Sequence, residues 1–148
     1  MSVTTEPAQA LLERTRGAAH PSCAVCGRAD ECGLGLRFSL QDDGSVEALF
    51  RCRQAHQGYT GMLHGGVTSA LLDGAMTNCL FAHGVTAVTG EMKVRFRHPI
   101  DLRRPVAVRG RLGRWQPPLY VAEAEVLQDG RVKANAEGRF LERLEGSA

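Results

Sequence analysis

Residues 64 to 73 carry two features with the chemistry of an acyl-transfer site. His64, Gly65 and Gly66 lead directly into an apolar segment that begins at Val67. If this segment is a helix, the amides of Gly65, Gly66 and Val67 are first-turn donors without an acceptor inside the helix. The glycines let another group approach the backbone closely. Donors at the positive end of a helix dipole suit a carbonyl oxygen that becomes an oxyanion during nucleophilic attack.

The second feature is Asp73, which lies seven residues after Gly66 in the same apolar segment. Burying a carboxylate without compensation costs several kcal/mol, on the order-of-magnitude scale, so this residue needs a reason to be there. One interpretation is a nucleophile or general base. The other is a structural acid that accepts hydrogen bonds from Ser69, from Asn78 or from a neighbouring chain.

A separate cluster of cysteine and histidine residues begins near the N-terminus. Its members have the ligand types of a tetrahedral zinc site: His20, Cys23, Cys26, Cys32, Cys52 and His56. They could hold a structural zinc, act as redox-sensitive thiols, or pack as small buried side chains in a turn. The catalytic chemistry considered above needs no metal, so no cofactor is expected to be required for it.

Hydrophobic periodicity predicts the elements that position these residues. Residues 8–16 favour a short helix, residues 36–50 a hairpin with its turn at 42–44, and residues 67–81 a helix that is apolar on nearly every side. Four strands follow, at 85–97, 105–115, 119–127 and 132–141, the last two joined by a tight Asp-Gly turn. An antiparallel sheet curled around one helix buries both apolar surfaces, which predicts an α+β fold.

Composition limits the other functions open to the chain. Its 148 residues fit one compact core, and no apolar stretch is long enough to cross a membrane. The first twenty residues lack the apolar core of a secretory signal, so a cytoplasmic protein is expected. A net charge of +2 is too mild to indicate nucleic-acid binding. Arginines gather between positions 95 and 114, either as solubilising groups on the outer face of the sheet or as contacts for phosphates.

Several segments together resemble the hotdog-fold acyl-CoA thioesterases of the phenylacetate-thioesterase (PaaI-like) group. The matching elements are Gly58, Gly61, His64-Gly65-Gly66 and Asp73, the strand segment 86–96, and the last strand segment 133–140. The resemblance covers residues 33 to 142, nearly the whole of a hotdog domain at 33–148, and leaves residues 1–32 as an extension with a short helix and the Cys/His cluster.

The resemblance implies a role for each matching residue. Asp73 corresponds to the helix carboxylate that activates water or attacks the thioester, Gly65 to the oxyanion donor, and His64 to the histidine that positions the loop and the thioester. Thr89 corresponds to a Ser or Thr that helps to hold the attacking water. Because the carboxylate and the glycine amide come from different subunits in this group, a homodimer or a homotetramer built as a dimer of dimers is expected.

The resemblance also implies the substrate, an acyl-CoA with a medium-chain or aromatic acyl group. Gly66 and Val67 would contact it, and Arg95 and Arg97, or else Arg103 and Arg104, would meet the coenzyme A phosphates. The alternative is a catalytically silent hotdog protein that binds acyl-CoA as a sensor or carrier. A hotdog dehydratase fits the glycine-rich helix entry and Asp73 poorly. Gly58 departs from some relatives, which carry an Asn there that is aimed at the reaction centre.

Overall fold

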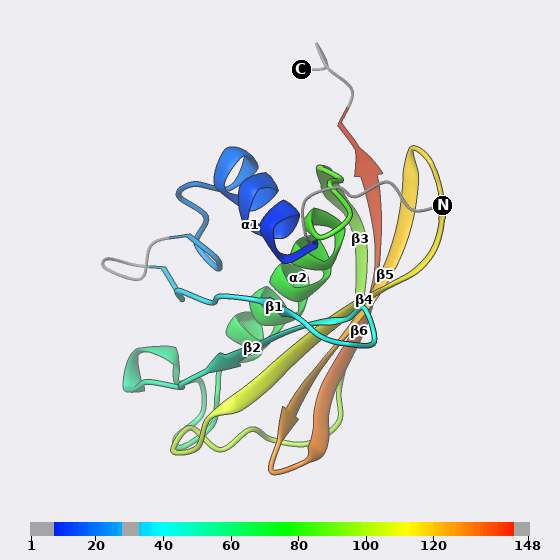
Figure 1. The fold of residues 1–148 in the computed structure, drawn as a ribbon. Coiled ribbons are helices and arrows are strands. Elements are labelled where there is room, and N and C mark those ends of the chain that lie inside the picture. The colour runs from blue at the N-terminus through cyan, green and yellow to red at the C-terminus, as the bar shows by residue number, and fades with distance from the viewer. Residues whose placement is uncertain (1–7, 28–32, 144–148) are drawn as a thin grey trace.

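Six strands form one antiparallel sheet in the computed structural model, which describes residues 8–27 and 33–143 (Figure 1). The strands are β1 (Ser39–Leu40), β2 (Val46–Phe50), β3 (Ala87–Phe96), β4 (Val106–Gln116), β5 (Leu119–Gln128) and β6 (Arg131–Glu142). Their order in the sheet is β1-β2-β4-β5-β6-β3, so the long strand β3 lies at an edge.

The helix α2 (Gly65–Phe81) packs along one face of this sheet. Nearly all of its residues from Leu71 onward are buried, which explains why its sequence is apolar around most of the circumference. The approach is closest at Gly110 of β4, where a Cβ atom would collide with the carbonyl oxygen of Ala75. This is the arrangement of a hotdog fold, and the predicted fold class is confirmed.

The helix α1 (Ala8–Ala19) covers the other side of α2. Figure 1 shows α2 lying between α1 and the sheet, and Leu12 of α1 is buried in the same hydrophobic core as α2. The short helix η1 (Gln54–His56) follows β2 and leads toward α2. Among the described residues, no helix combines the length and the apolarity needed to cross a membrane.

The predicted elements are all present, with different bounds. The helix expected over residues 67–81 begins at Gly65, and the one expected over 8–16 continues to Ala19. The strand expected from residue 36 begins only at Ser39, because the amide of Leu36 bonds to the carbonyl of Val25 in the preceding loop instead of to the sheet. The Asp129-Gly130 turn has positive φ at both residues, 53° and 77°, as a tight hairpin requires.

Candidate active site

His64 is the N-cap of α2. Its backbone is extended, with φ −63° and ψ 136°, and its Nδ1 accepts a 2.8 Å hydrogen bond from the amide of Gly66. Its own amide donates to the carbonyl of His56 at 2.9 Å, which fixes the loop in front of the helix. Because Nδ1 is an acceptor, the neutral ring carries its proton on Nε2, where it can donate to a bound group. His64 therefore both caps the helix and presents a donor to solvent.

The cap changes which first-turn amides can reach a substrate. The sequence suggested three donors, but the Gly66 amide is used by His64, so Gly66 is not a free donor. The amides of Gly65 and Val67 have no acceptor within the helix, as expected for the first turn. Gly65 is exposed, and a Cβ at its position would make only ordinary contact with the ring of Phe96, 3.6 Å away. The most accessible oxyanion donor is thus Gly65.

Asp73 is partly exposed, and its Oδ1 accepts a 2.7 Å hydrogen bond from the hydroxyl of Thr89. A register shift in the β3–β6 pairing between Thr89 and Glu91 accompanies this contact, since a bulge redirects the side chain beside it. Ser69 and Asn78 donate instead to the backbone carbonyls of Gly65 and Gly74, so the suggestion that they satisfy Asp73 is wrong. No other hydrogen bond joins Asp73 to the described residues, so Oδ2 has no hydrogen-bond partner among them.

The oxyanion donor Gly65 and the carboxylate of Asp73 are far apart within one chain. Gly65 and Asp73 lie eight residues apart on α2, which corresponds to about 12 Å along the helix axis. One carbonyl group cannot touch both the Gly65 amide and the Asp73 carboxylate of the same chain.

A pocket of about 750 Å³ opens at the N-terminal end of α2. His64 and Gly65 lie on its wall, next to an apolar lining made of Tyr59, Met62, Leu63, Phe96, Pro99 and Ile100. Phe96 and Tyr59 are 59% and 83% exposed, far more than is usual for aromatic side chains. Sequence reasoning did not assign Tyr59 or Phe96 to a pocket, because the position of β3 at the edge follows from the order of the strands and not from local spacing.

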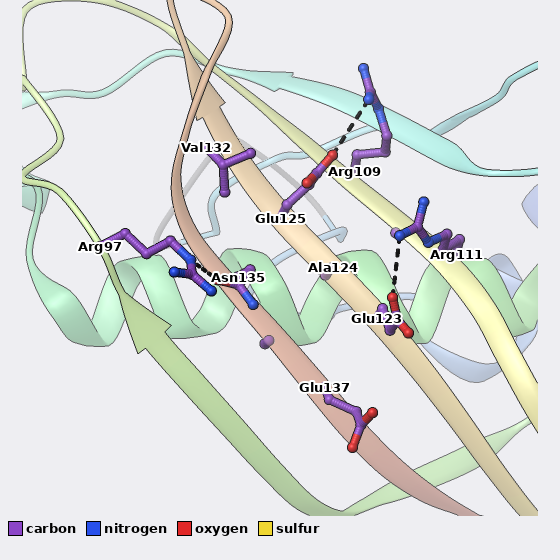
Figure 2. Close-up of a pocket in the computed structure, with 11 residues that line it drawn as sticks. Arg97, Arg109, Arg111, Glu123, Ala124, Glu125, Val132, Asn135 and Glu137 are labelled. Carbon is purple, nitrogen blue, oxygen red and sulfur yellow. Dashed lines mark hydrogen bonds and ion pairs between the residues drawn. The ribbon is translucent and has the colours of Figure 1, made fainter.

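Most of the clustered arginines are neutralised by acidic partners. Arg109 contacts Glu47 at 2.8 Å and Glu125 at 3.5 Å, and Arg111 contacts Glu123 at 3.3 Å. The side chains of Arg109, Arg111, Glu123 and Glu125 line a pocket of about 430 Å³ on the face of the sheet away from α2, as Figure 2 shows. Arg109 and Arg111 thus agree with the first interpretation, charged groups on the outer face of the sheet. Two further arginines, Arg103 and Arg104, pair with Asp101 and Asp129.

The two arginines singled out for substrate binding remain without acidic partners among the described residues. Arg97, the residue after β3, donates to the neutral amide oxygen of Asn135, and Arg95 near the end of β3 is exposed. Arg97 lines both the outer-face pocket and the pocket at the start of α2. Burial and the positive charges of Arg131, Lys133 and Arg97 lower the pKa of His98, which marks the local field as positive. This end of the sheet suits an anionic group.

The structure brings three of the six suggested metal ligands together. The ligand atoms of His20, Cys23 and Cys26 all lie within 4.8 Å of one another, and Cys52 and His56 are not part of this group. His56 packs against Phe50, and its Nδ1 accepts from the amide of Arg53. Cys32 lies outside the described residues. The three described side chains that converge are those closest together in sequence, whereas the more distant Cys52 and His56 lie elsewhere.

Known proteins resemble the chain in sequence and in fold. The bovine (Bos taurus) acyl-coenzyme A thioesterase THEM4 is 28% identical over 88 residues, which is 57% of this chain and 36% of that protein. The chain thus matches only about a third of this relative's length. The E. coli PaaI protein, from the phenylacetic acid degradation operon, superposes with a TM-score of 0.77 at 16% identity, over 92% of this chain and 96% of the other.

A third similar protein is a hypothetical thioesterase from Streptococcus pneumoniae TIGR4, solved with coenzyme A. It has a TM-score of 0.67 at 18% identity, over 72% of this chain and 87% of the other. The family model described as the thioesterase superfamily matches residues 60–137, more than half of the chain and the whole stretch from the loop before His64 to β6. The chain is a member of the thioesterase superfamily, and the solved structures that resemble its fold include the E. coli PaaI protein.

Proposed function

We propose that this protein hydrolyses an acyl-coenzyme A thioester to the free acid and coenzyme A. The observation that carries the proposal is the pair Asp73–Thr89: a partly exposed carboxylate that is the one charged group of α2, held among the described residues by a 2.7 Å hydrogen bond on one oxygen. The name of the bovine relative and the coenzyme A in the pneumococcal structure support the same substrate class.

In the proposed reaction, the Asp73 carboxylate activates a water molecule or attacks the thioester carbonyl itself. Thr89 holds Oδ1, so that Oδ2 faces the reacting carbon or the water. The Gly65 amide stabilises the oxyanion that forms, and the first-turn dipole of α2 adds to this effect. His64 positions the thioester with Nε2–H. The reaction uses no metal.

The proposed site combines two chains, because Gly65 and Asp73 of one chain are about 12 Å apart along α2. Two copies could meet along β3, an edge strand of ten residues that carries the exposed apolar side chains Val88 and Phe96. Asp73 of one subunit would then face Gly65 of the other. We infer a homodimer as the smallest active unit, with a homotetramer formed from two such dimers.

The pocket at the start of α2 would receive the pantetheine arm and guide the nucleotide toward the positive end of the sheet. Arg97 lines both that pocket and the outer-face pocket, and Arg95 lies two residues earlier, on β3, which supports contacts of both with phosphates. We propose a medium-chain or aromatic acyl group as the acyl part of the substrate.

A catalytically silent protein that binds acyl-CoA is the alternative, and turnover separates the two. Release of free thiol should be measured with acetyl-, hexanoyl-, palmitoyl-, benzoyl-, phenylacetyl- and hydroxybenzoyl-CoA. We expect Asp73→Asn to lower kcat by at least about two orders of magnitude with the oligomer intact. Binding of these thioesters without cleavage by the wild-type protein, or full activity of Asp73→Asn, would overturn the proposal.

A further inference from the structure

We propose that His20, Cys23 and Cys26 bind a zinc ion that fastens the loop 20–27 to α2. The Sγ atom of Cys26 lies 3.6 Å from Nδ1 of His20. Tetrahedral zinc with Zn–S and Zn–N distances of about 2.3 and 2.0–2.1 Å separates sulfur and nitrogen ligands by about 3.6 Å. The third ligand atom, on Cys23, is within 4.8 Å of both. A small movement of one side chain completes a three-ligand set.

The backbone of the loop is already shaped for two thiolate ligands. The amide of Gly27 bonds to the carbonyl of Cys23 at 2.9 Å, and a Cβ on Gly27 would lie 2.5 Å from the Cys23 backbone. Only glycine fits a turn this tight. The amide of Val25 points at Sγ of Cys23 at 3.3 Å, and a backbone donor on a ligand sulfur is the outer-shell contact that orients and stabilises a metal-bound thiolate.

Two arginines hold the turn from the outside. Arg16 of α1 donates to the carbonyl of Cys26 at 3.1 Å, and Arg37 donates to the same carbonyl and to that of Gly27. A zinc ion with two thiolates and one neutral imidazole has no net charge. Its burial beneath this loop therefore avoids the large cost of an uncompensated ion.

The ligands lie directly against α2. The His20 ring meets Phe81 edge-on, with centroids 5.0 Å apart, and Val25 occupies the space where a Cβ of Gly74 would be. Asn78, one turn further along, lies within reach of the Cys26 thiol, and its Oδ1 is buried with no hydrogen-bond partner among residues 8–27 and 33–143. This oxygen, close to the three ligands, is able to accept a hydrogen bond from a water molecule that occupies the fourth position on the zinc ion.

Redox sensing by the two cysteines is the competing use of this group. Cys26 is only 1% exposed, so oxidants and thiols in solution have little access to its sulfur. A thiolate bound to a buried metal ion needs no such access. The loop that carries the zinc ligands packs against α2 at Gly74, the residue after Asp73. The role of the zinc ion is therefore to hold this loop on the helix, and zinc binding does not require thioesterase activity.

The test is the metal content of the full-length protein, purified from zinc-supplemented cells without chelator and measured by mass spectrometry. We expect about one zinc per chain in the wild type and at least a tenfold lower content in Cys23→Ser. Cys52→Ser is the matched control, since Cys52 is also a half-buried thiol but lies outside the group, and it should keep its zinc.

A second measurement keeps the test valid if Cys23→Ser folds poorly. Wild-type protein stripped of metal is titrated with Co²⁺, which should give the visible absorption of a tetrahedral thiolate site, and with Zn²⁺, which should raise Tm. Absence of metal in the purified protein together with no response to either titration would overturn the inference. Equal zinc contents in the wild type and in a folded Cys23→Ser would overturn it as well.

Discussion

The hydroxyl of Thr89 donates a 2.7 Å hydrogen bond to Oδ1 of Asp73, and so links the edge strand β3 to the middle of α2. We expect Thr89→Val to lower kcat on the order of tenfold, because the carboxylate loses the charge-assisted bond that orients it. Thr89→Ser keeps the hydroxyl and should restore most of the rate. Thiol-release assays on folded proteins check this, and a Ser variant as impaired as the Val variant would argue against an orienting role.

Gly65→Pro removes one backbone donor with little other change. Proline is well tolerated at the first position of a helix, and the extended backbone of His64 (φ −63°, ψ 136°) is what a residue before proline adopts. Loss of an oxyanion donor should lower kcat by about 10²–10³-fold while Tm stays close to that of the wild type. Gly65→Ala, which keeps the amide, is the control. Similar losses in both variants would show that crowding, not the missing donor, is responsible.

Mixing the two inactive variants tests whether the site is shared between chains. If Asp73 of one subunit acts with Gly65 of the other, a hybrid of Asp73→Asn and Gly65→Pro contains one site with both changes and one intact site. Refolded mixtures should therefore recover activity that neither variant has alone. Mixtures that stay inactive although the hybrid dimers form, as native mass spectrometry can verify, would place both groups in a single chain.

Replacing Gly110 and Gly17 by alanine should change the free energy of unfolding in opposite directions. Gly110→Ala places a methyl group against the carbonyl of Ala75 in α2, and should lower the free energy of unfolding by about 1–3 kcal/mol. Gly17 lies in α1 with no atom near its missing Cβ, so Gly17→Ala should raise stability by up to about 1 kcal/mol. Urea unfolding measures both. Equal effects would mean that helix and sheet are not packed as closely as Gly110 indicates.

The sequence predicted the fold well because each element has a local signal. The apolar stretch after Gly66 and the Asp129-Gly130 turn are examples of periodicity and turn chemistry that act within a few residues. It also pointed to Asp73, since a carboxylate in an apolar helix is costly.

Contacts between distant segments were harder to predict. Thr89 lies sixteen positions after Asp73, and only the family resemblance singled it out, because no spacing rule reveals where an irregularity in β3 directs a side chain. Cys52 and His56 have the right ligand chemistry but lie elsewhere, because ligand type does not determine where β2 and η1 lead. The helix cap of His64 removed one expected donor, since a side chain competed for the Gly66 amide.

Asp101 should make stability depend on pH in the acid range. Its carboxylate accepts hydrogen bonds from the backbone and guanidinium of Arg103, and these bonds lower its pKa to about 2. The unfolded chain has an ordinary aspartate pKa of about 3.9. A lowered folded-state pKa contributes stability above the unfolded value, and this contribution is lost as the pH falls from about 4 through about 2.

Replacing the carboxylate by an amide removes this dependence on protonation. Asp101→Asn should be less stable than the wild type near pH 6, and the difference should shrink toward pH 2, because the wild-type residue is then protonated as well. Urea unfolding of both proteins at several pH values measures this. A difference that stays constant across the range would mean that the lost stability comes from altered packing of the loop around Asp101, not from the charge of its carboxylate.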